Sequence, residues 1–330
     1  MPLNTETLAG IGIPFLTILA LLLTGAALRR WGMVTRRGAR EMTRLVINVT
    51  LPPLIMITLA TEITPAELGR APLLVAMGIL GPLIGYLVAA ALGGLPGLTP
   101  ARRATLQAVI GMTNTTFVGY PVCKALLGDR GLLYAVLYDA GFTLIMSTLS
   151  VWLMSWNSRV GARKLADSAR DLARSPLLWS VVVGLAWGAF DWPMPAWIRV
   201  PLGTLGQATP PLALLTVGML VGPAKRLAGA TAPRAGARRP AERLQLALLT
   251  AARLLVAPAL MWGLVTLLRV ERAAAAVIVL QAAMPTAVAS TAMSEQYGGD
   301  SAFAARAVVA TTFLSLLTLP AWSWVLLGRG

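Results

Sequence analysis

Long apolar stretches recur along the whole chain and alternate with short polar or basic segments. About 20 apolar residues cross a bilayer as one helix, whereas membrane-spanning strands give short segments of alternating polarity, a pattern that this sequence does not show. The pattern predicts an all-α polytopic membrane protein with ten transmembrane helices. The predicted spans are residues 8–28, 45–61, 72–92, 103–127, 131–156, 176–192, 201–222, 244–268, 273–296 and 303–327.

Basic residues are distributed unevenly between alternate loops. Of the 28 Lys and Arg residues, 20 lie in or beside the loops that follow odd-numbered spans, and six lie in or beside the loops that follow even-numbered spans. Cytoplasmic loops are enriched in Lys and Arg. We therefore expect the odd-numbered loops in the cytoplasm and both termini on the extracytoplasmic side of the cell membrane.

The two halves of the chain share short motifs in the same order. Residues 52–58 (PPLIMIT) and 210–216 (PPLALLT) agree at both prolines, the leucine and the threonine, and Gly-Asp pairs at 128–129 and 299–300 precede the last span of each half. With five spans in each half, the halves have opposite orientations, which predicts two inverted five-helix repeats. The predicted divisions are a first repeat at 1–156, a short basic cytoplasmic linker at 157–175 and a second repeat at 176–330.

Two of the spans are interrupted by a proline among small polar residues. The fourth contains GMTNTTFVGYPVCKALLG with Pro121, and the ninth contains QAAMPTAVASTAMSEQYGG with Pro285. Proline removes a backbone donor and clashes with the carbonyl four residues earlier, so each helix must kink or open. Free backbone groups are tolerated at membrane depth only inside protein or along a cavity, and in transporters a pair of such breaks marks the substrate site.

Polar side chains around the two breaks are the candidate substrate ligands. Four consecutive polar residues in the fourth span exceed what one kink needs, which favours ligand binding over the satisfaction of freed backbone groups. For the hydroxyls of the ninth span, close helix packing is an equal alternative. The candidates are Thr113, Asn114, Thr115, Thr116, Gln281, Thr286 and Ser290, with Pro121 and Pro285 as the crossover residues.

The predicted topology brings the chain into the two breaks from opposite sides of the membrane. The helix halves that begin near Pro121 and Thr286 would then direct their N-terminal N–H groups toward one point. Such an end favours an anion by about 0.3–1 kcal/mol when it is exposed, and by up to about 2 kcal/mol when it is partly buried. We therefore expect an anionic substrate.

Few ionisable residues lie within the spans, where each costs about 2.5–3.5 kcal/mol at the bilayer centre. Lys124 and Glu295 lie near span ends, from which their charges can reach the interface. Asp139 lies deeper, and it either serves as a proton or cation site or accepts hydrogen bonds from neighbouring threonines. Arg253 in the eighth span invites a functional hypothesis by its position alone.

The composition narrows the class of function. Hydrophobic residues make up 57% of the chain and charged residues 12%, about half the charged share of soluble domains. The net charge of +15 is concentrated in short loops, so it indicates membrane topology rather than nucleic-acid binding. The chain has no histidine, one cysteine (Cys123), no phosphate-binding loop, no zinc-protease helix and no nucleophile elbow. We expect no metal, no cofactor and no enzymatic activity.

Several longer motifs resemble the auxin efflux carrier family of membrane transport proteins, and together they cover nearly the whole chain. They are NVTLPPLIM, TNTTFVGYP, LLGDRGLLYAVLYD, TPPLALLTVGMLVG, AAMPTAVASTAMSEQYGGD and VVATTFLSLLTLP. The resemblance implies that helices four and nine are broken and cross at their prolines. It also implies a scaffold of helices one, two, six and seven, with the remaining helices moving as an elevator-type transport domain.

Residue by residue, the resemblance carries over only in part. The asparagine in the family's span-four break corresponds to Asn114, but the family often has Gly-Asn-Thr-Gly where this chain has Thr113-Asn-Thr-Thr116. The family also commonly has an asparagine after the span-nine proline, where this chain has Ala289-Ser290. The long central loop of plant members is absent, which points to a prokaryotic-type member.

These observations together predict a secondary transporter that moves a small organic anion, such as an auxin-like compound or a dicarboxylate, across the lipid bilayer by alternating access. Asp139 is the candidate for proton coupling, and a homodimer formed through the scaffold helices is a further expectation. Two alternatives remain open: a sodium-coupled bile-acid-type symporter, and a ligand-binding receptor on the same scaffold.

Overall fold

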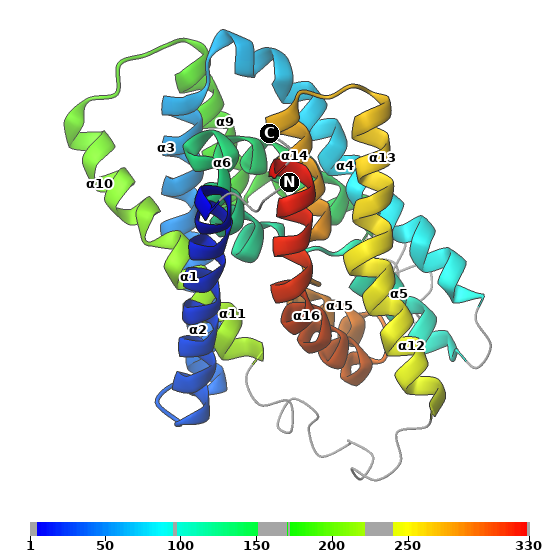
Figure 1. The fold of residues 1–330 in the computed structure, drawn as a ribbon. Helices are drawn as coiled ribbons and strands as arrows, with labels where there is room; N and C mark the ends of the chain where they lie inside the picture. The colour runs from blue at the N-terminus through cyan, green and yellow to red at the C-terminus, as the bar shows by residue number, and fades with distance from the viewer. Residues whose placement is uncertain (1–4, 95–97, 151–169, 171, 222–239, 329–330) are drawn as a thin grey trace. The chain divides into compact units, whose positions relative to one another are not determined.

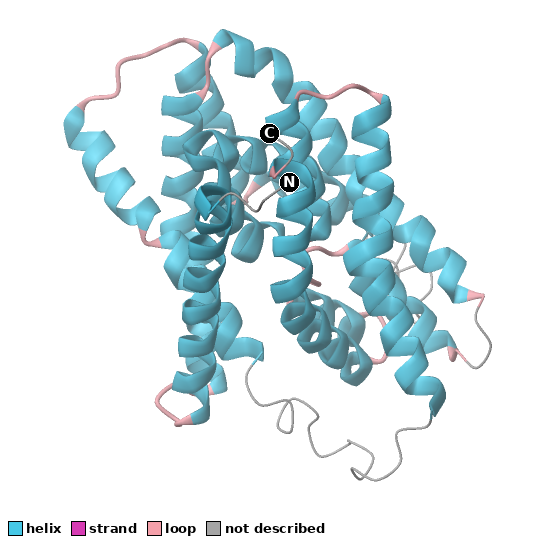
Figure 2. Cartoon of the chain, viewed as in Figure 1, coloured by secondary structure: helices cyan, strands magenta, loops and turns pink. Residues whose placement is uncertain are grey.

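The computed structural model of the chain describes residues 5–94, 98–150, 170, 172–221 and 240–328, and all regular elements in these ranges are helices (Figure 1, Figure 2). Most of the predicted linker at 157–175 lies outside the described residues. The α-helices are α1 (Thr5–Arg30), α2 (Arg36–Leu45), α3 (Leu51–Glu62), α4 (Pro65–Gly93), α5 (Pro100–Gly111), α6 (Tyr120–Ile145), α9 (Pro176–Ala189), α10 (Ala196–Gln207), α11 (Thr209–Val221), α12 (Pro240–Ala251), α13 (Ala257–Leu267), α14 (Arg272–Ala283), α15 (Ala289–Gln296) and α16 (Ser301–Leu327).

The prediction of an all-helical fold is confirmed for the described part of the chain, and the count of ten spans stays a prediction. There, seven helical stretches are long and apolar enough to cross a membrane, and α9 and α14 are shorter apolar helices. The two interrupted spans are each divided: α5 ends at Gly111 before the first break, and α14 and α15 flank the second.

Within the described residues, four π-helical turns widen the helices locally, and three of them end two residues before a proline. The turns are Val46–Thr50, Thr115–Gly119, Met146–Ser150 and Ala252–Val256, and the prolines are Pro52, Pro121 and Pro258. In each of the three cases the carbonyl four residues before the proline lies inside the turn. The wider turn accommodates the proline ring and its missing N–H without ending the helix.

Gly128 interrupts α6 with φ of 66° and ψ of −155°. This backbone conformation is open essentially to glycine alone, because a Cβ would clash with the backbone. The interruption falls between the predicted end of the fourth span at 127 and the predicted start of the fifth at 131.

The described helices belong to two compact units. The first comprises Met1–Gly78, Thr116–Thr143 and Ala166–Gly222, and it contains the four segments expected to form the scaffold. Within it, α1 packs along α11, and α3 packs against α9 and α10. Gly25 and Gly218 permit the first of these contacts: an added Cβ would overlap a backbone carbonyl of the opposite helix in each case.

The second unit comprises Ile79–Thr115, Leu144–Leu165 and Pro223–Gly330. In it, α14 packs between α13 and α16, and α5 packs against α15 and α16. One apolar cluster joins α4, α5, α12 and α16, and it includes Ala89, Val109, Ile110, Leu249 and Phe303. The expected transport-domain helices are thus shared between the two units, so the scaffold and elevator assignment stays a prediction.

Candidate functional site

The two predicted breaks meet through their backbones in the second unit. Thr113 and Thr286 form an isolated antiparallel bridge. On either side of it, the Asn114 N–H donates to the Pro285 carbonyl at 2.8 Å, and the Ala287 N–H donates to the Met112 carbonyl at 2.9 Å. Breaking a helix inside a membrane exposes such groups at a high cost, so this short pairing explains how the chain tolerates both breaks.

Pro285 takes part in this pairing through its carbonyl, whereas Pro121 belongs to the first unit. Pro121 is the second residue of α6 and follows the π-helical turn Thr115–Gly119. The contact on the first side is therefore made by Met112, Thr113 and Asn114, at the point where α5 ends.

Thr286 fixes the second break with both of its polar groups. Its N–H donates to Thr311 Oγ1 at 3.2 Å, and its hydroxyl donates to the Val109 carbonyl at 2.8 Å. Thr286 is fully buried, and these bonds join the break to α16 and to the end of α5. The structure thus shows a structural role for this candidate.

Three other candidates present buried polar atoms with no hydrogen-bond partner among the described residues. They are Gln281 (both amide atoms), Ser290 (Oγ) and Thr113 (Oγ1). Gln281 and Ser290 are both 0% exposed. Folded proteins leave few such groups, because each unsatisfied donor or acceptor costs about 1–3 kcal/mol. These groups are therefore available to a polar ligand or to water.

Asn114 and Thr115 are also buried, at the end of the paired segment. Asn114 uses its backbone N–H in the pairing, so its side-chain amide is not needed to satisfy the break. The side-chain amide of Asn114 can therefore still bind a ligand, as the sequence predicts.

Asp139 and Thr116 lie together in the first unit. Asp139 Oδ2 accepts hydrogen bonds from the Thr116 hydroxyl at 3.1 Å and from the Tyr120 hydroxyl at 3.0 Å. Of the two interpretations of Asp139, the structure shows the hydrogen bond from a neighbouring threonine, and a proton-coupling role stays a prediction. Tyr120 was not a candidate, since nothing in the sequence relates it to a carboxylate nineteen residues later.

Arg253 lies at the C-terminal ends of the two helices that lead into the breaks, a position that its sequence context did not reveal. The side chain is 2% exposed. Its Nη2 donates to the carbonyls of Ala282 and Met284 at 2.6 and 2.9 Å, its Nε donates to Met284 at 3.2 Å, and its Nη1 donates to Ile110 at 3.4 Å. A cation at a helix C-terminus is favourable because the last carbonyls carry partial negative charge.

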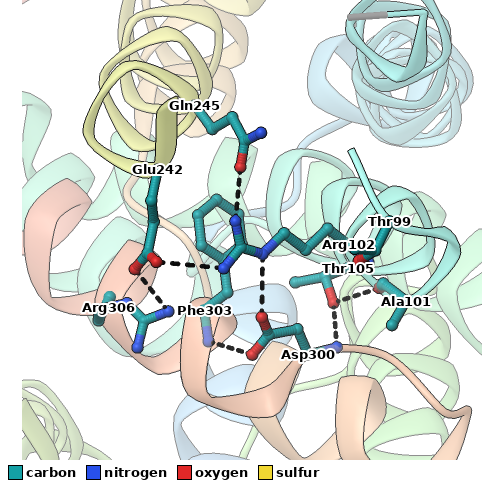
Figure 3. Close-up of polar contacts among 9 residues, drawn as sticks. All are labelled: Thr99, Ala101, Arg102, Thr105, Glu242, Gln245, Asp300, Phe303 and Arg306. Atoms are coloured by element: carbon teal, nitrogen blue, oxygen red, sulfur yellow. Dashed lines mark hydrogen bonds and ion pairs between the residues drawn. The ribbon is translucent and has the colours of Figure 1, made fainter. Parts of the chain in front are cut away.

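A second polar cluster joins the starts of α5, α12 and α16 (Figure 3). At its centre the Arg102 guanidinium donates to Asp300 at 3.1 Å, to Gln245 at 2.8 Å and to Glu242 at 3.2 Å, and it lies over the Phe303 ring. Arg306 forms an ion pair with the other oxygen of Glu242 at 2.9 Å. Two guanidinium groups thus face two carboxylates, which indicates a structural clamp.

Asp300 also begins α16 in this cluster. Its Oδ1 accepts the Phe303 N–H at 2.8 Å, and its own N–H donates to Thr105 Oγ1 at 2.8 Å (Figure 3). A carboxylate at this position caps the helix and interacts favourably with its dipole. The Gly-Asp motif at 299–300 therefore acts as a helix start.

Comparisons with known proteins cover almost the full chain. A family model described as "Membrane transport protein" matches residues 11–323. An uncharacterized transporter of Methanothermobacter thermautotrophicus is 28% identical over 318 residues, which cover 94% of this chain and 97% of that protein. An uncharacterized transporter of Methanocaldococcus jannaschii is 24% identical over 327 residues, with the same two coverages.

Proposed function

Because the chain belongs to the membrane transport protein family, that of the auxin efflux carriers, we propose that it is a secondary transporter for a small organic anion. The substrate class is a carboxylate, such as an auxin-like compound or a dicarboxylate. It binds at the paired breaks and crosses the membrane by alternating access.

The observation that carries this proposal is the pairing of Thr113 with Thr286 beside unpartnered polar groups. The backbone bonds of the pairing satisfy the broken helices by themselves. The amide of Gln281 and the hydroxyls of Ser290 and Thr113 are therefore surplus to the needs of the fold. Surplus polar groups buried at a broken membrane helix are what a transporter needs to replace the hydration shell of its substrate.

The preference for an anion rests on the charges around the second break. The helix α15 begins after Val288 without a side-chain oxygen to accept its first N–H groups. The N–H groups of Ser290 and Thr291 donate to the carbonyls of Ala287 and Val288, and the dipole of such a helix start favours an anion. The guanidinium of Arg253, bound at the carbonyl of Met284, adds a full positive charge to the same break.

The inverted repeat and the elevator motion belong to the same proposal, and a pair of ion pairs supports the repeat. The helix of the third span, α4, begins with Pro-Ala-Glu at 65–67, and the helix that begins the eighth span, α12, begins with Pro-Ala-Glu at 240–242. Glu67 bonds to Arg130 at 3.0 Å, and Glu242 bonds to Arg306 at 2.9 Å. In each half, a glutamate near the start of that half's third helix is thus paired with an arginine near the start of its fifth span.

We also propose a cell-membrane location with both termini on the extracytoplasmic side, which the distribution of Lys and Arg supports. Proton coupling through Asp139 and a homodimer through the scaffold helices are further parts of the proposal.

Uptake into vesicles tests the proposed function. The purified protein is reconstituted into liposomes, and counterflow of labelled dicarboxylates and indole carboxylates is measured in sodium-free buffer across a range of pH. We expect saturable exchange of at least one acid without sodium. Exchange that strictly requires sodium would favour the symporter, and saturable binding without flux would favour the receptor.

A further inference from the structure

The guanidinium of Arg253 is held by main-chain carbonyls at the ends of both helices that enter the breaks. Ile110 lies in the last turn of α5, Ala282 lies in the last turn of α14, and Met284 is the C-cap residue of α14. Their oxygens accept hydrogen bonds from Nη1, Nη2 and Nε of Arg253. All of these residues belong to the second unit.

The breaks themselves make these carbonyls available. In an unbroken helix, the Ile110 carbonyl would accept the N–H of Asn114, but that N–H donates to Pro285. The Ala282 carbonyl would likewise accept the N–H of Thr286, which donates to Thr311 Oγ1. Each break thus diverts the donor that its own helix would have used, and the freed oxygens of the two helices converge on one point.

Converging backbone carbonyls at helix C-termini form a cation site. Such oxygens are the protein's usual ligands for ions at unwound membrane helices, and the negative ends of two helix dipoles add to their attraction. A charge inside the membrane is kept only where polar partners compensate its lost hydration. Arg253 meets this condition through four hydrogen bonds to three carbonyls.

We propose that Arg253 is the resident cation of this carbonyl site and that it closes the position to external cations. Its bearing on transport rests on the proposed function. An anion that binds at the breaks meets the fixed positive charge of Arg253. This charge takes the place of a cation that would otherwise be transported together with the anion.

Thermal unfolding of the purified protein with guanidinium as the probe tests this assignment. Arg253→Ala removes the side chain and leaves the three carbonyls facing an empty space. We expect a lowered Tm that rises again by ~3–8 °C, saturably, as millimolar guanidinium chloride replaces choline chloride at constant ionic strength. Tetramethylammonium, which has no N–H donors, is expected to give no rise.

Arg272→Ala is the matched control. Arg272 also donates to backbone carbonyls, those of Leu326 and Leu327 at the end of α16, but it is exposed and leaves no enclosed site. The wild-type protein and Arg272→Ala are expected to show no saturable response to guanidinium. An Arg253→Ala variant that shows none either, or a wild type that responds equally, would overturn the proposal.

Lysine and methionine at the same position decide the matter if Arg253→Ala does not fold. Arg253→Lys keeps a cation with three donors, whereas Arg253→Met keeps the length of the side chain without the charge. The proposal requires a clearly higher Tm for Arg253→Lys, and equal losses for both variants would refute it. Since no organic acid is present in these assays, their outcome is independent of whether the protein transports one.

Discussion

Gln281 shows at the scale of one residue how the fold and the proposed function compete. Its amide is fully buried in the last turns of α14, and both polar atoms lack a partner among the described residues. A buried amide in this state lowers stability, and a methionine of similar shape would avoid the loss. The cost of burying the amide is offset only if a ligand or an ordered water forms hydrogen bonds with it.

Gln281→Met is expected to leave the free energy of unfolding unchanged or to raise it by up to about 2 kcal/mol, because it removes an unsatisfied group. The Tm is expected to follow in the same direction. The same change is expected to abolish binding of the transported acid, as measured by ligand-induced thermal shift. Gln245→Met is the matched control, since Gln245 Oε1 accepts a bond from Arg102 at 2.8 Å. That control should lose about 1.5–3 kcal/mol, and an equal loss in Gln281→Met would contradict the interpretation.

The indole N–H of Trp322 replaces the hydrogen-bond donor that Pro258 lacks. Pro258 has no N–H for the carbonyl of Leu254, and the indole N–H of Trp322 donates to that oxygen at 3.0 Å. Trp322→Phe keeps the ring but removes the donor, and it should lower the free energy of unfolding by about 1–3 kcal/mol.

Trp262→Phe provides the comparison for that measurement. Trp262 packs edge-on against Trp322 with ring centroids 6.2 Å apart, and its replacement leaves the indole–carbonyl bond intact. The two variants should therefore differ clearly in Tm, and equal values would show that the bond adds nothing.

At the scale of whole elements, the contact between α1 and α11 depends on two glycines. A Cβ at Gly25 would overlap the Leu215 carbonyl, and a Cβ at Gly218 would overlap the Leu22 carbonyl. Small residues at such positions let membrane helices approach closely enough to pack. Each of the two helices therefore contributes one glycine that the close contact requires.

Gly25→Ala is expected to lower the free energy of unfolding by about 1–3 kcal/mol, because the helices must separate to admit the methyl group. Gly12→Ala, in the same helix, meets nothing within 4 Å and should be neutral or slightly stabilising. Thermal unfolding of the two variants measures the difference, and similar values for both would remove the close contact as a source of stability.

The elements themselves could be predicted largely from the sequence, whereas their partners could not. Runs of apolar residues predict spans, and the polar interruption at Thr113–Thr116 predicts a break, because both depend on local composition. The pairing of Thr113 with Thr286 depends on register between segments far apart in the chain. The partners of Arg253 depend in the same way on three separate helices, so its charge could be recognised as unusual but not assigned.

As a whole molecule, the chain belongs to a family of membrane transport proteins, and its two broken helices pair through their backbones. The family is shown by the match over residues 11–323, and the relatives it resembles are named as transporters. The fold uses backbone pairing, Thr286 and Arg253 to stabilise the breaks. We propose that the amides of Asn114 and Gln281 and the hydroxyl of Ser290 bind the substrate.

Uptake by the Asn114→Ala variant tests this central claim most directly. The measurement is the initial rate of labelled substrate entry into proteoliposomes at equal amounts of folded protein. Asn48→Ala is the control, because Asn48 donates to the Arg44 carbonyl within its own helical turn and lies away from the breaks in the sequence. Loss of a hydrogen bond to a charged substrate predicts a fall of about 10- to 100-fold for Asn114→Ala, with little change for Asn48→Ala. Unchanged uptake by Asn114→Ala would contradict the placement of the substrate at the paired breaks.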